Sequence, residues 1–341
     1  MAQSIYEFNP ASFTEIVRAN HSFVLTTHIN PDGDALGSEI GLAEWLLSIG
    51  KSVRIFNHSP IPENYKFLDA ERPLIEIFDE SKHRNIVLEA DVFALLDTND
   101  PDRSKSLSSL LVEHPNTVLI DHHLEPKEFA KARFIDTDAT STGEMIYRLV
   151  SDSMNTLGGS ITPKSAQGLY VAIMTDTGSF RFPRTDSDIL RISADLLDRG
   201  ADPVRSYNET YNTARVARIK LIGKCLSSLE LFFDERLATQ VITQADLTEA
   251  AAVPEEVDGF VQFPLQVATI EYSIFFLELK EGWKISFRSR GKRSAAEVAK
   301  QFGGNGHFNA AGARIFREIS YHDLKAEVLV AVERELNKPI S

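Results

Sequence analysis

The first half of the chain alternates short apolar runs with segments of helical periodicity. Residues 22–28, 51–57, 91–98 and 116–123 are short runs rich in Val, Leu, Ile and Phe, which is typical of buried strands. Residues 34–50, 140–150 and 163–174 instead show the pattern of helices; the first has a stripe of Leu36, Ile40, Ala43 and Leu47 and ends at Gly50. Strands that alternate with helices predict an α/β fold, with a mainly parallel sheet covered by helices on both faces.

The second half has a different organisation. From residue 184 the pattern is polar and purely helical, and Gly200 and Pro203 divide it into two predicted helices. A further unit is expected from residue 216, with a long helix, strands within 232–246, 268–280 and 282–290, and helices over 294–302 and 322–336. We therefore predict an N-terminal domain over 1–184, a helical connector over 185–215 and a smaller α/β domain over 216–341.

The composition argues against a membrane protein and against a secreted one. The chain has 341 residues, of which 43% are hydrophobic and 25% charged, as expected for two globular domains. No apolar run reaches the roughly 18 residues that a membrane span needs, and MAQSIYEFNP lacks the basic and apolar regions of a signal peptide. The single cysteine, Cys225, lies in an apolar helical pattern and is expected to be a buried structural thiol. We expect a cytoplasmic protein with no membrane partner.

The net charge of −13 constrains the partners. Binding to a long nucleic acid usually leaves a basic footprint on a domain, and here the balance is acidic. A small phosphorylated substrate remains compatible with this charge if cations and a local basic cluster supply the positive field. The sequence leaves a homodimer open.

Polar clusters follow the predicted strands and one predicted helix. His28, Asp97 and the run Asp121-His122-His123 all fall at the C-terminal ends of strands, where open α/β sheets bind ligands. Pro31 and Gly33 turn the chain after the first strand, so that Asp32 and Asp34 can point into the same volume as His28. Asp176 follows the apolar helical run 163–174. Alternative interpretations are a helix-capping turn with Asp34 as the N-cap, and an ordinary turn residue for Asp97.

Together these clusters offer oxygen and imidazole ligands and no thiolate. The candidate metal ligands are His28, Asp32, Asp34, Asp97, His122 and Asp176. Such a set suits Mn²⁺, Mg²⁺ or Co²⁺ better than structural zinc, and its size fits two ions about 3.5–4 Å apart that share a carboxylate. The remaining histidines at positions 21, 58, 83, 114 and 322 lack this setting and are expected to be ordinary surface residues.

The predicted second domain carries a glycine-rich run and a basic cluster. The small residues of GGNGHFNAAG, residues 303–312, allow backbone N–H groups to approach an anion closely. The alternative is a helix C-cap with a tight turn, which would need only one glycine. Upstream, Arg288 and Arg290 are expected to share a strand face and to grip a phosphate. Lys284, Lys292 and Arg293 complete the cluster, and the last two fit a solvated strand edge equally well.

The chain resembles the DHH phosphoesterase superfamily, named for the run at 121–123. Four motifs occur in the order expected of that superfamily: HINPDGDALGS, LLDTND, DHH and YVAIMTDTGSFRF. In addition, GGNGHFNAAG resembles the signature of the superfamily's DHHA1 domain. The resemblance covers nearly the whole chain and is strongest to the bacterial nanoRNase (oligoribonuclease) and pAp phosphatase group. One departure is Asn305, where glycine is usual; because Asn tolerates positive φ, we expect a modest effect.

The resemblance implies roles for individual residues. His28 and Asp32 would hold one ion, Asp34, His122 and Asp176 the other, and Asp97 would bridge them. Asp121 would orient a histidine, and His123 would face the phosphoryl group or the leaving oxygen. Contacts to the substrate would come from Arg288, Arg290, Gly303, Gly304, Gly306, His307 and Asn309, with the active site in a cleft between the domains.

The resemblance also implies an activity. We expect a two-metal enzyme, loaded preferentially with Mn²⁺, that hydrolyses very short oligoribonucleotides to mononucleotides and removes the 3′-phosphate of pAp. A phosphodiesterase for linear or cyclic dinucleotides and a pyrophosphatase have similar metal chemistry, and an exonuclease for long single-stranded DNA is disfavoured by size and charge. A nucleotide-binding regulator without catalysis is the alternative from another class, and the complete ligand set argues against it.

Overall fold

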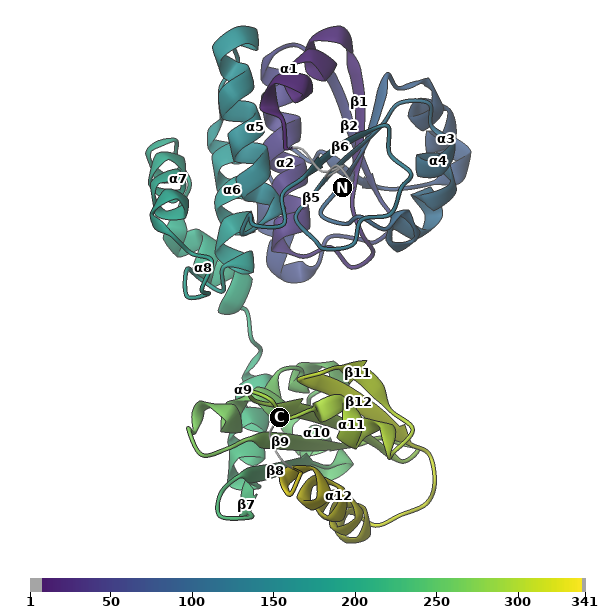
Figure 1. Ribbon diagram of the computed structural model, residues 1–341, viewed down its shortest axis with the longest axis vertical. Coiled ribbons are helices and arrows are strands. Elements are labelled where there is room, and N and C mark those ends of the chain that lie inside the picture. Colours follow the sequence, from purple (N-terminus) through teal and green to yellow (C-terminus); the bar gives the residue numbers. More distant parts are fainter. Residues whose placement is uncertain (1–7, 339–341) are drawn as a thin grey trace. The chain divides into compact units, whose positions relative to one another are not determined.

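The chain folds into two compact units that meet in the sequence between residues 213 and 214 (Figure 1). The computed structural model describes residues 8–338, so most of the N-terminal segment used above to argue against a signal peptide lies outside the described residues. Within the described residues, no helix is long and apolar enough to cross a membrane.

The first unit is a doubly wound α/β domain. Its strands are β1 (Ser22–Thr26), β2 (Ser52–Asn57), β3 (Ile75–Ile77), β4 (Val92–Leu96), β5 (Thr117–Asp121) and β6 (Ala132–Ile135). Its helices are α1 (Pro10–Ala19), α2 (Gly33–Ser48), α3 (Glu80–Glu89), α4 (Ser108–Glu113), α5 (Thr142–Leu157), α6 (Pro163–Asp176), α7 (Ser187–Asp198) and α8 (Pro203–Tyr211), with 3₁₀ turns η1 (Glu63–Leu68) and η2 (Pro101–Leu107). The predicted α/β fold is confirmed.

All strand pairs of the first sheet are parallel, in the order β3-β2-β1-β4-β5-β6. Alternate side chains of each strand enter two cores. Leu25 and Leu96 belong to the core under α1, α2, α5 and α6, and Val24 and Leu95 to the core under α3 and α4; Figure 1 shows these helices on the two faces. The chain winds outward from β1 in one direction and from β4 in the other, so the switch point lies between β1 and β4.

Helices α2 and α6 pack unusually closely. A Cβ atom added at Gly37 of α2 would lie 2.2 Å from the carbonyl oxygen of Gly168 in α6, so only glycine allows this approach. The contact explains why α2 is buried on nearly every side rather than along the single predicted stripe. It also brings the first residues of α2 beside Asp176, the last residue of α6.

Of the predicted connector over 185–215, residues 185–213 lie within the first unit. They form α7 and α8, with the break at Gly200 and Pro203 as predicted. Gly200 has a φ of +104°, which ends α7 in a conformation that favours glycine.

The second unit holds a mixed sheet in the order β11-β12-β10-β9-β8-β7, antiparallel except between β8 and β9. Its elements are α9 (Val216–Ser227), β7 (Glu230–Phe232), β8 (Leu237–Ile242), α10 (Gln244–Ala250), η3 (Pro254–Val257), η4 (Phe260–Gln266), β9 (Tyr272–Glu278), β10 (Trp283–Ser289), α11 (Ala295–Lys300), β11 (Asn305–His307), β12 (Ala310–Ile315) and α12 (Tyr321–Leu336). Helices α11 and α12 cover one face and α9 and α10 the other. Cys225 of α9 is fully buried, as predicted, and burial raises the pKa of its thiol to about 12.

Candidate metal centre

The polar residues predicted from the sequence meet at the C-terminal edge of the first sheet. His28 follows β1, Asp97 follows β4, and Asp121 is the last residue of β5. These three strands are neighbours in the sheet, and β1 and β4 flank its switch point. The N-terminus of α2 adds Asp32 and Asp34, and the C-terminus of α6 adds Asp176. The six candidate metal ligands therefore come from four separate segments of one unit, at 28–34, 97, 122 and 176.

The first group of potential ligands comprises His28, Asp32 and Asp97. The Nε2 atom of His28 lies 3.5 Å from Oδ2 of Asp97 and 4.0 Å from Oδ2 of Asp32. Its Nδ1 atom lies 2.9 Å from the backbone carbonyl oxygen of Ile29, to which it donates a hydrogen bond. This bond fixes the tautomer and leaves the lone pair of Nε2 directed at the carboxylates, as in imidazoles that bind metal.

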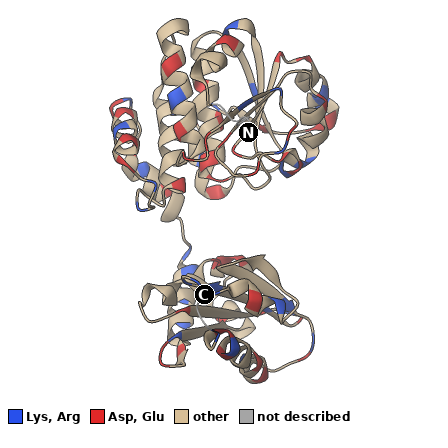
Figure 2. Cartoon of the chain, viewed as in Figure 1, with Lys and Arg blue, Asp and Glu red and all other residues tan. Residues whose placement is uncertain are grey.

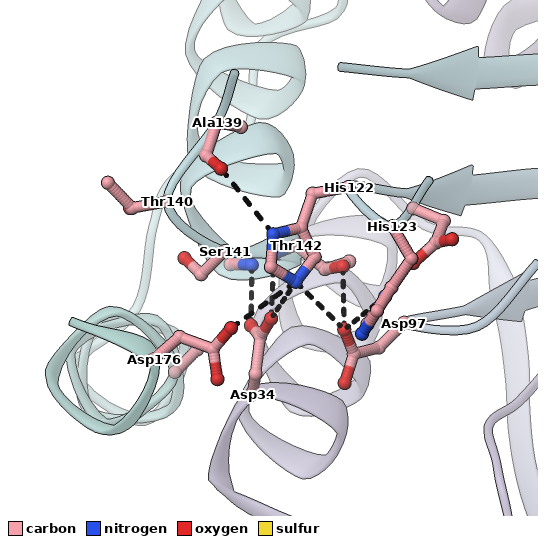
Figure 3. A network of polar contacts seen from close by, with 12 residues as sticks. Asp34, Asp97, His122, His123, Ala139, Thr140, Ser141, Thr142 and Asp176 are labelled. Atoms are coloured by element: carbon pink, nitrogen blue, oxygen red, sulfur yellow. Dashed lines mark hydrogen bonds and ion pairs between the residues drawn. The ribbon is translucent and has the colours of Figure 1, made fainter. Parts of the chain in front are cut away.

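The second group comprises Asp34, His122 and Asp176 (Figure 3). Nε2 of His122 lies 3.3 Å from Oδ2 of Asp176 and 3.7 Å from Oδ2 of Asp34. It is also 3.7 Å from Oδ1 of Asp97, so this carboxylate lies between the two groups. Nδ1 faces the carbonyl oxygen of Ala139 at 3.4 Å.

Backbone and hydroxyl groups at the N-terminus of α5 hold two of the carboxylates. Asp34 accepts hydrogen bonds from the N–H groups of Thr142 at 2.7 Å and Gly143 at 2.8 Å, and Asp97 accepts one from Oγ1 of Thr142 at 3.0 Å. The sequence reasoning missed Thr142 and Gly143. The pattern Ser141-x-x-Glu144 marks a helix start and could have revealed them, because a helix N-terminus binds anions.

The turn after β1 differs from the capping turn considered above. The N-cap of α2 is Asp32, not Asp34: its Oδ1 accepts from the N–H groups of Asp34 and Ala35, both at 3.1 Å. Asp34 is the second residue of the helix and is fully buried. Asp97 is also more than a turn residue, since it is 2% exposed and has a φ of +59°, a conformation that costs energy for a residue other than glycine.

The carboxylates of the cluster are buried close together, so that a nearby positive charge would stabilise their ionised forms. Burial, followed by the charges of Asp97 and Asp176, raises the pKa of Asp34 well above its ordinary value. Burial, followed by Asp32 and Asp176, does the same for the pKa of Asp97. Burial alone would lower the pKa of His122, but the nearby carboxylates of Asp176 and Asp34 raise it to about 9. Asp176 also sits at the negative end of α6, where a carboxylate is disfavoured.

The residues fit divalent cations. Nε2 of His122 is buried and has no hydrogen-bond partner among the described residues, although it points into the carboxylates. In each group the ligand atoms lie within 4.8 Å of one another, so both groups can hold an ion, and Asp97 can serve both. Oxygen and imidazole donors without a thiolate suit Mn²⁺ or Mg²⁺. When bound, such cations polarise phosphoryl oxygens and lower the pKa of water.

His123 stands at the exposed rim of this cluster. Its Nδ1 atom lies 2.7 Å from Oδ1 of Asp121, which is fully buried, while 46% of the His123 side chain is exposed. The same nitrogen lies 4.0 Å from Oδ1 of Asp97. Asp121 thus fixes the orientation of the His123 ring.

Two other histidines are not the surface residues expected from the sequence. His83 is 8% exposed and stacks on Phe56 with ring centroids 4.3 Å apart. His114 is 4% exposed, and both its ring nitrogens have backbone partners, Ala90 at 3.1 Å and Asn116 at 3.2 Å. Polar spacing in the sequence could not reveal that aromatic and backbone partners stabilise these rings in the interior.

Part of the expected substrate site assembles in the second unit. Lys284, Ser286 and Arg288 alternate along one face of β10, opposite Arg314, Gly312 and Ala310 of β12. Because Gly312 and Ala310 are small, a pocket of about 380 Å³ forms there, lined also by Gly306 and His307. The sequence reasoning did not select Lys284 or Ser286 as ligands. Gly303 and Gly304 line a separate pocket beside Lys284 and Arg314.

The remaining predicted contacts lie elsewhere. Arg290 follows the end of β10 and donates to the backbone carbonyls of Leu265, Val267 and Ala268, so it does not share a strand face with Arg288. Asn309 donates to Oγ of Ser289 at 3.0 Å, which ties the hairpin to the end of β10.

Arg293 is not part of a solvated strand edge. It is 7% exposed and pairs with Glu271, whose Oε2 lies 2.6 Å from its Nε atom.

The glycine-rich run forms part of a β-hairpin. Residues 305–307 are β11 and pair antiparallel with β12. Positive φ occurs at Gly303 (+70°) and Gly306 (+150°), and Asn305 lies in extended strand. The departure from glycine at 305 therefore needs no tolerance of positive φ.

Comparisons with known proteins agree with the geometry. The DHH family, N-terminal domain, matches residues 22–173. A protein of Thermus thermophilus named bifunctional oligoribonuclease and PAP phosphatase NrnA is 31% identical over 92% of this chain and 90% of its own length. A Bacillus subtilis protein of the same name is 28% identical over 89% and 93%.

A solved structure resembles nearly the whole chain. The crystal structure of an exopolyphosphatase-related protein from Bacteroides fragilis superposes with a TM-score of 0.80 at 28% identity, covering 98% of this chain and 97% of its own. Because the Thermus thermophilus protein is 31% identical over 92% of this chain and the family match covers residues 22–173, this chain belongs to the DHH family.

Proposed function

We propose that this protein is a metal-dependent phosphoesterase that hydrolyses very short oligoribonucleotides to mononucleotides and removes the 3′-phosphate of pAp. The observation that carries the proposal is the shared position of Asp97 between two groups of buried ligands, the arrangement expected of a dinuclear centre. The relatives named as oligoribonuclease and PAP phosphatase supply the substrate class.

The metal centre would be held as the resemblance implies. His28 and Asp32 would hold one cation, Asp34, His122 and Asp176 the other, and Asp97 both, with Mn²⁺ as the preferred ion. Thr142 and Gly143 would keep Asp34 in place through their N–H groups. Because the buried carboxylates of the cluster repel one another, bound cations would relieve this repulsion and would be held tightly.

His123 would act on the substrate. The Asp121 carboxylate accepts a hydrogen bond from Nδ1–H of His123. Nε2, on the opposite side of the ring, would therefore face the phosphoryl group or the leaving oxygen.

The second unit would bind the nucleotide. Arg288 can grip a phosphate with two N–H groups, and Lys284 and His307 line the same pocket. The contacts of Arg290 and Asn309 with the protein itself favour a structural role, so the proposal rests on Arg288, Gly306 and His307. Figure 2 shows Lys and Arg interspersed with Asp and Glu on the helices of both units, and with a net charge of −13 this favours short substrates over long nucleic acid.

A substrate panel with Mn²⁺ tests the proposal. The panel contains pAp, the linear dinucleotide pApA, cyclic di-AMP, a 5-mer, a 30-mer and pyrophosphate, with product release followed by chromatography. We expect rapid turnover of pAp and pApA, slower turnover of the 5-mer and none of the 30-mer. Preference for cyclic di-AMP would assign the protein to cyclic dinucleotides, and turnover of pyrophosphate alone would refute the nucleotide assignment.

A further inference from the structure

A recess in the first unit adjoins the candidate metal centre and is separate from the pocket beside Arg288. It measures about 310 Å³, at the lower end of the range of small-molecule sites. His122 and Asp176 line one side of it. The other side is formed by Phe182, Pro183, Arg184 and Thr185, which follow α6 in the sequence. A molecule held at the metal ligands can therefore extend into this recess.

Phe182 is fixed in place although 53% of it is exposed. A Cβ atom at Gly178 would lie 2.6 Å from Cε1 and Cζ of the Phe182 ring, so the ring rests directly on the glycine backbone. The N–H group of Phe182 donates to the carbonyl of Thr177 at 3.0 Å. An exposed aromatic ring with one supported face is a ready stacking surface.

The backbone that presents this ring has an uncommon conformation. Gly178, Ser179 and Phe180 have φ values of +56°, +59° and +64° in succession. Residues other than glycine disfavour this left-handed conformation. Such conformations cluster at functional sites. Here three of them begin two residues after Asp176 and lie between that candidate ligand and Phe182, and both Asp176 and Phe182 line the recess.

Polar groups of the recess complete the site. Oγ1 of Thr185 is buried and has no hydrogen-bond partner among the described residues. Nη1 of Arg184 donates to the carbonyls of Thr137 at 2.8 Å and Ala139 at 3.3 Å. Ala139 is also the partner of Nδ1 of His122, so one carbonyl links the wall of the recess to the metal cluster (Figure 3).

We propose that this recess binds the nucleobase of the nucleotide whose phosphate is hydrolysed, an inference that rests on the proposed function. Unpaired bases are recognised by stacking on aromatic rings and guanidinium planes and by hydrogen bonds to their edges. Phe182 supplies the ring, and Thr185, which lines the recess, carries a hydroxyl that has no partner among the described residues. A second phosphate fits less well, because Phe182 and Pro183 are apolar and Nη1 of Arg184 already binds carbonyls.

The test compares pApA with the same dinucleotide lacking both bases, using the full chain with Mn²⁺. Phe182→Ala should raise KM for pApA about 10-fold or more with little change in kcat, since stacking contributes to binding. The abasic dinucleotide should be cleaved by this variant within about twofold of the unmodified protein. Phe182→Tyr retains an aromatic face and should restore KM, and Leu190→Ala, at a site 54% exposed on α7, should leave both substrates unchanged.

Inhibition provides a second readout. Phe182→Ala should weaken inhibition by AMP about 10-fold and leave inhibition by ribose 5-phosphate unchanged. If Phe182→Ala weakens the binding of base-containing and abasic molecules equally, or weakens the binding of neither, the inference is overturned. Turnover of pApA and pAp by the unmodified protein would still uphold the proposed function in that case. Failure of the unmodified protein to cleave pApA and pAp would refute the proposed function together with this inference.

Discussion

Replacing Asp97 with asparagine should stabilise the metal-free protein and remove its stabilisation by metal. The substitution keeps the size of the side chain, and the amide oxygen can still accept the hydrogen bond from Thr142. It removes a buried charge whose pKa is raised by burial and by the neighbouring carboxylates, chiefly Asp32. The two effects have opposite signs, which distinguishes a metal ligand from an ordinary structural carboxylate.

The magnitude follows from the geometry. Ligand atoms of Asp32 and Asp97 lie within 4.8 Å of each other, and two full charges at that distance repel by about 3.5 kcal/mol at an effective dielectric constant of 20. Because 56% of the Asp32 side chain is exposed, solvent screening reduces this to about 1 kcal/mol. Metal at 100 times its dissociation constant stabilises the unmodified protein by about 2.7 kcal/mol, or about 5–11 °C in Tm for a domain of this size.

Differential scanning calorimetry with EDTA and with saturating Mn²⁺ measures both effects. We expect the first unit of Asp97→Asn to melt about 2–4 °C higher than the unmodified protein in EDTA and to gain little on addition of Mn²⁺. Asp152→Asn, which neutralises an exposed carboxylate on α5, is the matched control and should behave as the unmodified protein. An unchanged response to Mn²⁺, or a loss of several degrees in EDTA, would refute the reasoning.

Three further predictions concern pH, a buried acid and the nucleotide pocket. In the folded metal-free protein the pKa of Asp34 is raised well above its ordinary value and that of His122 is raised to about 9, so protonation of either group favours folding. The Tm of the metal-free protein should therefore fall as the pH rises from 5 to 9. A Tm that rises over this range would contradict the prediction. Burial raises the pKa of Glu39 from 4.5 to about 8, which costs about 3 kcal/mol of stability at pH 7. Glu39→Gln should therefore raise the urea midpoint at pH 7 but not at pH 4, whereas a lower midpoint at pH 7 would argue for a required charge. Arg288→Ala should raise KM for pAp about 10- to 100-fold and spare bis-p-nitrophenyl phosphate; equal losses on the two substrates would remove its role in gripping nucleotides.

The sequence predicted the first sheet and the place of the candidate site because both follow from local pattern. Short apolar runs define β1, β4 and β5, and side chains at the C-terminal ends of parallel neighbours must lie close together. His28, Asp97 and Asp121 could thus be placed together without knowledge of any distance. Asp176 was selected by its position after an apolar helix, and its approach to Asp34 depends on the close packing at Gly37, which one sequence does not disclose.

Contacts between distant residues accounted for what could not be predicted. The amide groups of Thr142 and Gly143 carry no side-chain signature, although they hold Asp34 from over 100 residues away in the sequence. The small residues of the glycine-rich run show no alternation, so the pairing of residues 305–307 with β12 could not be predicted from the sequence. Arg290 has the same charge as Arg288, and only the fold directs it to backbone carbonyls.

The release of AMP from pApA by protein stripped of metal and then titrated with Mn²⁺ tests the central claim most directly. We expect no release after stripping, and a rate that rises until two Mn²⁺ are bound per chain, as measured by elemental analysis of the same samples. Release that persists without metal, or that reaches its plateau with no more than one ion per chain, would contradict a two-metal phosphoesterase built on the cluster around Asp97.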